Sequence, residues 1–212
     1  MKQSTAGKAR VVGAAAVAAL VVSVGTACAP LVVGAIAAGT AYVVTDRRTT
    51  GSQVDDQAIQ LRLADELRAV FANQPVHINV NSFDRKVLLT GEVPDEAAKA
   101  RAGSVAAASQ NVRAVVNELA VMPPTSTSER TADTALSAKV RAALINTREV
   151  EVNSIKFVTE RGIVYLMGYV TDKEGQIAAI VASKVAGVKQ VVKVFDIATQ
   201  EEVDKRRVLA PK

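Results

Sequence analysis

The strongest constraint on the fold is an internal repeat, in which two stretches of the chain match at a separation of 77 residues. Segment 86–93 (KVLLTGEV) matches segment 163–170 (IVYLMGYV), with a glycine at the sixth position of each. Before each segment, apolar residues recur at every fourth position, which places them on one face of a helix. They are Ile59, Leu63 and Leu67 in the first copy and Leu136, Val140 and Leu144 in the second. This self-similarity indicates two copies of one structural unit.

Each copy predicts the same order of elements: helix, strand, strand, helix, strand. The first two strands are separated by a short turn, which is typical of a hairpin. The predicted fold class is α+β, with a three-stranded mixed sheet and two covering helices in each unit. The expected helices are 55–72, 95–108, 132–146 and 172–186, and the expected strands are 77–81, 85–93, 112–121, 151–158, 162–170 and 188–197.

Two local signals add detail to the second half of each unit. Thr171 and Glu174 have the spacing of a capping box at a helix start. Gly91 and Gly168 end strands and are not followed by a phosphate-binding loop pattern. We therefore expect these glycines to mark bulges or places where two backbone segments approach closely.

The order of elements, the apolar-Thr/Met-Gly-x-Val strand ends and the closing Val-Val strands resemble the BON domain. With the N-terminal features described below, the chain resembles outer-membrane lipoproteins that carry two BON domains. That resemblance implies a periplasmic role in envelope integrity, a link to division sites, and binding of anionic phospholipid through the second domain. Members of the family carry a tryptophan near the start of the second domain's first helix, where this chain has Ala135.

The N-terminal segment has the layout of an export signal that ends at Cys28. Three cations, Lys2, Lys8 and Arg10, precede an apolar run at 11–22, and the small residues 25–27 lead to the cysteine. This pattern resembles a bacterial lipobox, although Gly25 stands where leucine is usual. The resemblance implies cleavage before Cys28 and its acylation. A retained transmembrane helix is the alternative, because the chain stays apolar from 29 to 44.

These signals divide the chain into a signal, a tether, two folded units and a tail. Pro123 and Pro124, among serines and threonines, predict a linker between the units. The charged residues after Gln200 predict a frayed end. The predicted segments are 1–27 (signal peptide), 28–54 (lipidated terminus and tether), 55–121 (first BON domain), 122–131 (linker), 132–197 (second BON domain) and 198–212 (charged tail).

The sequence predicts no catalytic site, metal site or cofactor. His77 is the single histidine and Cys28 the single cysteine, so no Cys/His spacing for a metal exists. The net charge of +5 falls to +2 if the signal is removed with its three cations. Because no basic stripe with stacking aromatics accompanies that charge, we expect no nucleic-acid partner.

The first helix of the second unit carries a second apolar face, opposite the residues expected in the core. Ala135, Ala138, Ala142 and Ile145 form this face, and Lys139, Arg141 and Arg148 border it. An exposed helix face is normally polar. An apolar face with a basic border is instead typical of a helix that lies on a membrane surface. The seven residues are the predicted lipid-binding site, with an anionic phospholipid membrane as the partner.

Two alternatives remain open from the sequence. The alanine-rich face could pack against the first unit, for which small side chains are well suited. The protein could also act as a non-enzymatic scaffold that docks onto outer-membrane assembly machinery, division proteins or the cell wall. In either case the expected location is the outer membrane, with a lipid anchor and the folded units facing the periplasm.

The prediction for the anchor is that the mature chain begins at an acylated Cys28 and that Cys28→Ser leaves an unprocessed precursor. A single acyl chain gives only reversible attachment, so stable anchoring requires the several chains of a mature lipoprotein. Intact mass of the protein purified from membranes tests this expectation. An unmodified chain that still begins at Met1 would contradict it.

Overall fold

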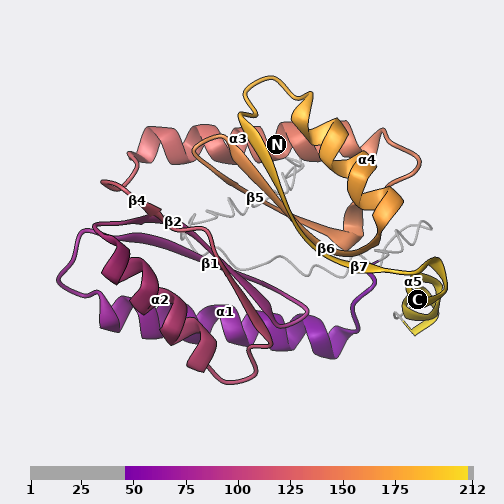
Figure 1. The fold of residues 1–212 in the computed structure, drawn as a ribbon. Coiled ribbons are helices and arrows are strands. Elements are labelled where there is room, and N and C mark those ends of the chain that lie inside the picture. The colour runs from indigo at the N-terminus through magenta and orange to yellow at the C-terminus, as the bar shows by residue number, and fades with distance from the viewer. Residues whose placement is uncertain (1–45, 210–212) are drawn as a thin grey trace, which may run out of the picture. The chain divides into compact units, whose positions relative to one another are not determined.

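The structure is a computed structural model that describes residues 46–209, without the side chains of 207–209. The predictions for the signal peptide, for Cys28 and for most of the tether lie outside these residues. None of the helices between residues 46 and 209 is long and apolar enough to span a bilayer. The described chain contains both copies of the repeat (Figure 1).

The first domain has two helices on one face of its sheet (Figure 1). Strand β2 is central: β1 pairs with it antiparallel, whereas β3 and β4 pair with it in parallel. The predicted final strand is thus broken into two short pieces. The elements are α1 (Thr50–Val70), β1 (His77–Phe83), β2 (Lys86–Val93), α2 (Glu96–Ala108), β3 (Ala114–Asn117) and β4 (Ala120–Val121).

The second domain repeats this architecture with an unbroken final strand. Its sheet has the order β5-β6-β7, with an antiparallel hairpin followed by a parallel pair. The predicted α+β class is therefore confirmed for both units. The elements are α3 (Thr127–Ile145), the 3₁₀ turn η1 (Val152–Ser154), β5 (Ile155–Glu160), β6 (Ile163–Thr171), α4 (Asp172–Ser183), β7 (Gln190–Ala198) and α5 (Gln200–Leu209).

The repeated apolar spacing builds the two helix-to-sheet cores. Leu63 on α1 and Val140 on α3 occupy equivalent positions, and both are fully buried. Alanines on the second helix of each domain, such as Ala102 and Ala182, allow that helix to lie close to the sheet. Truncating a buried leucine costs about 2–5 kcal/mol of stability, so Leu63 contributes a large share of its domain's stability.

The two strand glycines lie where backbones meet, as the sequence predicts. A Cβ atom on Gly91 would lie 2.0 Å from the carbonyl oxygen of His77, and the φ of Gly91 is +110°. A Cβ atom on Gly168 would lie 2.6 Å from the carbonyl oxygen of Ser154. Neither position accommodates a side chain without moving the neighbouring strand. The predicted capping box of Thr171 and Glu174 is also present.

A buried carboxylate on the first helix of each domain holds the following hairpin turn. Each turn has two residues with positive φ, which is typical of a tight type I′ hairpin. Asp56 accepts hydrogen bonds from both backbone N–H groups of the first turn. Asp133, 77 residues later, accepts hydrogen bonds from both N–H groups of the second turn. Burial alone would raise the pKa of Asp56, but hydrogen bonds from Ser82 and the turn outweigh it and lower the pKa. The turn residues are Asp84, Arg85, Arg161 and Gly162.

In three connecting segments the structure places helix where the sequence predicted none. Helix α3 begins at Thr127, inside the predicted linker 122–131, because Ser126 and Glu129 form a capping box there. Helix α1 begins at Thr50, inside the predicted tether 28–54, with Thr49 as its N-cap.

The predicted frayed tail, 198–212, instead contains helix α5. Val203 of α5 is fully buried. The guanidinium of Arg206 lies 3.7 Å from the ring centre of Tyr169 on β6 and 3.3 Å from the carboxylate of Asp84 in the first domain. Charged residues surround Val203 in the sequence of α5, so the apolar spacing of this helix is too weak to predict it.

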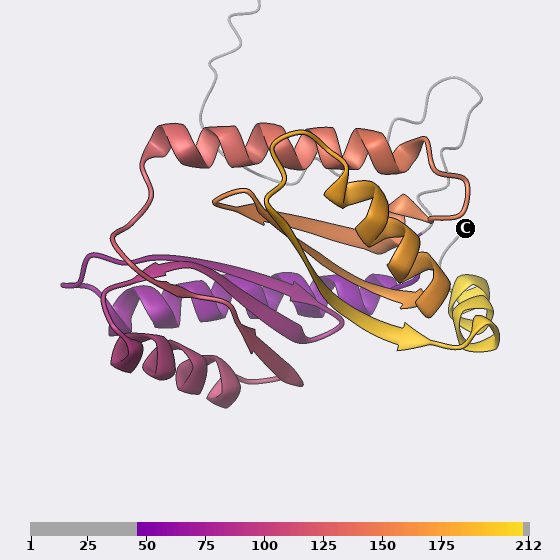
Figure 2. The same ribbon diagram turned by 45° about the horizontal axis from the view of Figure 1, so that its top comes forward.

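The two domains pack through their sheets. Along β2, Val87 and Leu89 face helices α1 and α2, whereas Leu88 faces the second domain. Along β6, Val164 faces α3 and α4 in the same way, whereas the side chain of Tyr165 points towards the first domain. The shared core consists of Phe83, Leu88, Val158, Tyr165, Met167 and Val194. Each sheet therefore has helices on one face and the other sheet on its second face (Figure 2).

Candidate functional site

The structure places all seven predicted lipid-binding residues in exposed positions. Six lie on α3 and the seventh, Arg148, follows its end. Ile145 is the most informative, because 63% of its surface is exposed although it is a large apolar side chain. The exposed residues are Ala135, Ala138, Lys139, Arg141, Ala142, Ile145 and Arg148.

The alternative that this face packs against the first domain is wrong. The opposite stripe of α3, with Leu136, Val140 and Leu144, is the one buried, and it packs within the second domain. The first domain contacts the other side of the second sheet, so it does not cover the alanine-rich face. Helix α3 lies on the outside of its domain in both views (Figures 1 and 2).

The bordering cations differ in what they contact. Within residues 46–209, Lys139 and Arg148 form no ion pair with an acidic residue. Arg141 makes a long hydrogen bond of 3.4 Å to the side chain of Asn153, and its guanidinium lies 6.0 Å from the ring centre of Phe157. The charges of Lys139 and Arg148 are thus available to an anionic surface, whereas Arg141 leans onto η1 and β5 of its own domain.

The equivalent helix of the first domain is also partly apolar on its exposed face. Val54 and Leu61 on α1 are 62% and 60% exposed. Asp65 and Arg68 then interrupt the stripe, and they form an ion pair with each other at the surface. The position that matches Ile145 is Arg68, so the apolar stripe is shorter on α1 than on α3.

A buried polar cluster also connects the two domains. Glu92 on β2 is fully buried, and its Oε1 accepts a hydrogen bond of 2.6 Å from Arg161 of the second domain. Its Oε2 accepts from the backbone N–H and the hydroxyl of Thr125, at 3.0 and 3.1 Å. Burial opposes the charge, but the bonds from Thr125, Arg161 and His77 prevail and lower the pKa of Glu92.

Among the described residues, His77, Glu92 and Glu160 bring ligand atoms within 4.8 Å of one another. His77 Nδ1 lies 3.0 Å from Glu92 and 3.9 Å from Glu160. Burial raises the pKa of Glu160, despite a hydrogen bond of 2.8 Å from Asn79. A metal ion would have to share Glu92 with Arg161, which already supplies a positive charge. The sequence could not indicate this group, because Glu160 belongs to a different domain from the other two.

Comparison with known proteins shows the family. The family model of the BON domain matches residues 55–123 and 132–199, more than half of the chain. The protein belongs to the BON-domain family. The family expected from the sequence is thereby confirmed. The first match covers most of α1 to β4, and the second covers most of α3 to β7.

Three relatives share most of their length with this BON-domain protein. The outer membrane lipoprotein DolP of Haemophilus influenzae is 34% identical over 169 residues, which cover 79% of this chain and 87% of DolP. The 21 kDa hemolysin of Actinobacillus pleuropneumoniae is 31% identical over 152 residues, or 71% of this chain and 78% of the hemolysin. An uncharacterized protein in the gshII 5′ region of Anaplasma centrale is 33% identical over 143 residues, which cover 66% of this chain and 92% of that protein.

The interdomain cluster yields a prediction for stability. Arg161→Met should destabilise the protein by about 1–3 kcal/mol, because it leaves the buried Glu92 carboxylate without its cation. Equilibrium unfolding in urea measures the change. Arg113→Met is the matched control, since its ion pair with Asp196 also joins the domains but is more exposed. Its loss should cost about 0–1 kcal/mol. Equal, small effects of both substitutions would contradict the importance of the buried pair.

Proposed function

We propose that this BON-domain protein is an outer-membrane lipoprotein that faces the periplasm and binds anionic phospholipid through the outward face of α3. In this role it supports envelope integrity, including at division sites, and catalyses no reaction. The observation that carries the proposal is the exposure of Ile145, with three alanines beside it and unpaired cations at its border. The similarity to DolP supports the location at the outer membrane.

The physical basis for membrane binding is a shallow contact that combines apolar and electrostatic terms. Full burial of an isoleucine side chain contributes about 1.5–3 kcal/mol. The alanines keep the helix surface flat, so the backbone can approach the lipid headgroups closely. Lys139 and Arg148 add attraction to a negative surface, which salt weakens. Because this chain lacks the family's tryptophan at Ala135, we expect the contact to be weak in isolation.

The lipid anchor explains how a weak contact can still be effective. Acylation of Cys28 would hold the domains near one membrane, and this raises the effective concentration of α3 at the lipid surface. The anchor would then determine which membrane is bound, while α3 would determine how the domains rest on it.

The alternative function is a non-enzymatic scaffold that docks onto outer-membrane assembly machinery, onto division proteins or onto the cell wall. The exposed Val54 and Leu61 on α1 favour it, because they leave an apolar surface on the first domain as well. A surface used by a protein partner would not require anionic lipid. Vesicle binding therefore separates the two functions.

The prediction for the site is that Ile145→Glu weakens binding to phosphatidylglycerol-containing vesicles at least about tenfold. The substitution removes the apolar contact and adds a charge that the anionic surface repels. Co-sedimentation with vesicles of graded anionic content measures the loss, and circular dichroism checks the fold. Binding should also fall with rising salt.

Leu61→Glu is the matched control, because it makes a similar change at a similarly exposed position on α1. We expect this variant to bind vesicles like the wild type. Equal binding of the wild type to neutral and anionic vesicles, or undiminished binding by Ile145→Glu, would exclude the α3 site and favour the scaffold function.

A further inference from the structure

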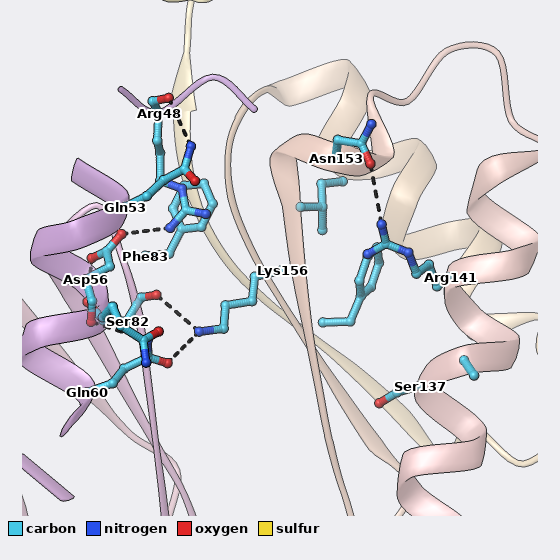
Figure 3. A pocket seen from close by; sticks show the side chains of 14 residues that line it. Arg48, Gln53, Asp56, Gln60, Ser82, Phe83, Ser137, Arg141, Asn153 and Lys156 are labelled. Atoms are coloured by element: carbon cyan, nitrogen blue, oxygen red, sulfur yellow. Dashed lines mark hydrogen bonds and ion pairs between the residues drawn. The ribbon is translucent and has the colours of Figure 1, made fainter. Parts of the chain in front are cut away.

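A pocket of about 520 Å³ lies between the two domains, at one edge of the sheet-to-sheet contact (Figure 3). One wall comes from α1 and the end of β1 in the first domain. The other wall comes from α3, η1 and β5 in the second domain. Three cations line it, Arg48, Lys156 and Arg141, against a single acid, Asp56. The pocket is therefore positively charged although it is formed by a domain interface.

Lys156 is the unusual member of the lining. It points from β5 across to the first domain, where its Nζ donates 2.7 Å to Gln60 Oε1 and 3.3 Å to the carbonyl of Ser82 (Figure 3). Both acceptors are neutral, and within the described chain Lys156 forms no ion pair. A partly buried ammonium without a counter-ion is costly, and a bound anion would relieve that cost.

The other charges of the pocket do not compensate Lys156. Asp56 is occupied by the hairpin turn, by Ser82 and by Arg48, whose Nη1 donates to it at 2.8 Å. Arg48 is in turn satisfied by Asp46 and by the ring of Phe83, 4.2 Å away. Arg141, on α3 in the same wall as Lys156, has its long bond to Asn153 and the ring of Phe157 as its contacts. The charges of Lys156 and Arg141 are therefore the two that lack an acidic partner.

We propose that this pocket is an anion-binding site, in which Lys156 and Arg141 hold a phosphate or sulfate group between the two domains. An ammonium and a guanidinium in one wall of the pocket can each donate charge-assisted hydrogen bonds to such a group. Ile155 and Phe157 in the lining provide an apolar wall for carbon atoms attached to it. The group could belong to a phospholipid headgroup or to a free phosphorylated molecule.

This site goes beyond the proposed membrane face and does not depend on it. The membrane face is centred on Ile145, Ala142 and Lys139, none of which lines the pocket. Ala138 and Arg141 mark the border between the two surfaces, since both line the pocket. A soluble anion could thus bind the pocket of a protein that does not touch a membrane.

Calorimetric titration of the full chain in uncharged detergent, with sulfate as the probe at constant ionic strength, tests the proposal. We expect saturable binding of one sulfate per chain. Lys156→Met should weaken it about tenfold or more, as loss of a charge-assisted contact does. Arg141→Gln, an exposed change that should leave folding intact, should weaken it similarly. Lys184→Met, which removes an exposed lysine at the C-cap of α4 and outside the pocket lining, should leave it unchanged.

The pH dependence gives a second readout that does not rely on a substitution. Burial, and then the charge of Arg48, lowers the pKa of Lys156 to about 8, while Asp56 opposes this shift. Sulfate keeps its charge in this range, so its binding should weaken as the pH rises through about 8 and Lys156 loses its proton. Lys156→Arg should bind sulfate without this pH dependence, because a guanidinium stays charged.

The source of the anion follows from two further titrations. Inorganic phosphate represents a free ligand, and glycerophosphoglycerol represents the headgroup of phosphatidylglycerol. Whichever of the two binds more tightly, and loses affinity in Lys156→Met, identifies the source of the anion. Tighter binding of either one supports the site. Ile145→Glu should bind sulfate normally, which separates this site from the membrane face. Absence of saturable sulfate binding, or equal affinity of the wild type and Lys156→Met, would overturn the proposal.

Discussion

The packing of one sheet against the other is the contact on which the rest of this structure depends. It buries side chains such as Leu88 and Tyr165 that would otherwise leave each domain with an apolar sheet face in water. At its edge it also buries Glu92, which is tolerated because Arg161 of the second domain and Thr125 of the connecting segment donate hydrogen bonds to it. The apolar centre supplies the association, and the polar cluster fixes how the two sheets align.

This packing determines which surfaces remain free. Because the sheets face each other, all four domain helices lie outside, and the apolar outward face of α3 is left without a partner in the described chain. The first and last segments of the described residues reinforce the arrangement. Arg47, just before α1, forms a buried ion pair with Glu174 of α4, and Arg206 of α5 reaches Asp84 of the first domain. The pocket with Lys156 is a consequence of the same contact, since neither domain forms it alone.

The features that the sequence predicts correctly are those that depend on the spacing of residues within one unit. The order of elements, the burial of Leu63 and Val140, and the composition of the α3 face all follow from periodic patterns within one unit. The sheet-to-sheet contact was missed, although a signal exists: 86–93 and 163–170 contain consecutive apolar residues, typical of strands buried on both faces. The contacts that Arg161 makes to Glu92, and Lys156 to Gln60 and Ser82, had no such signal, because each joins one domain to the other and no spacing relates the residues.

The central claim is that α3, and not its counterpart α1, presents the membrane-facing surface. A polarity-sensitive fluorophore on a single introduced cysteine, in Cys28→Ser protein, tests it directly. Ala142→Cys reports on α3 and Ala58→Cys on α1, and both positions are exposed. With anionic vesicles that carry nitroxide on their acyl chains, the label at 142 should shift to the blue and be quenched, and the label at 58 should not change. An unchanged signal at 142, or equal quenching at both positions, would contradict the account.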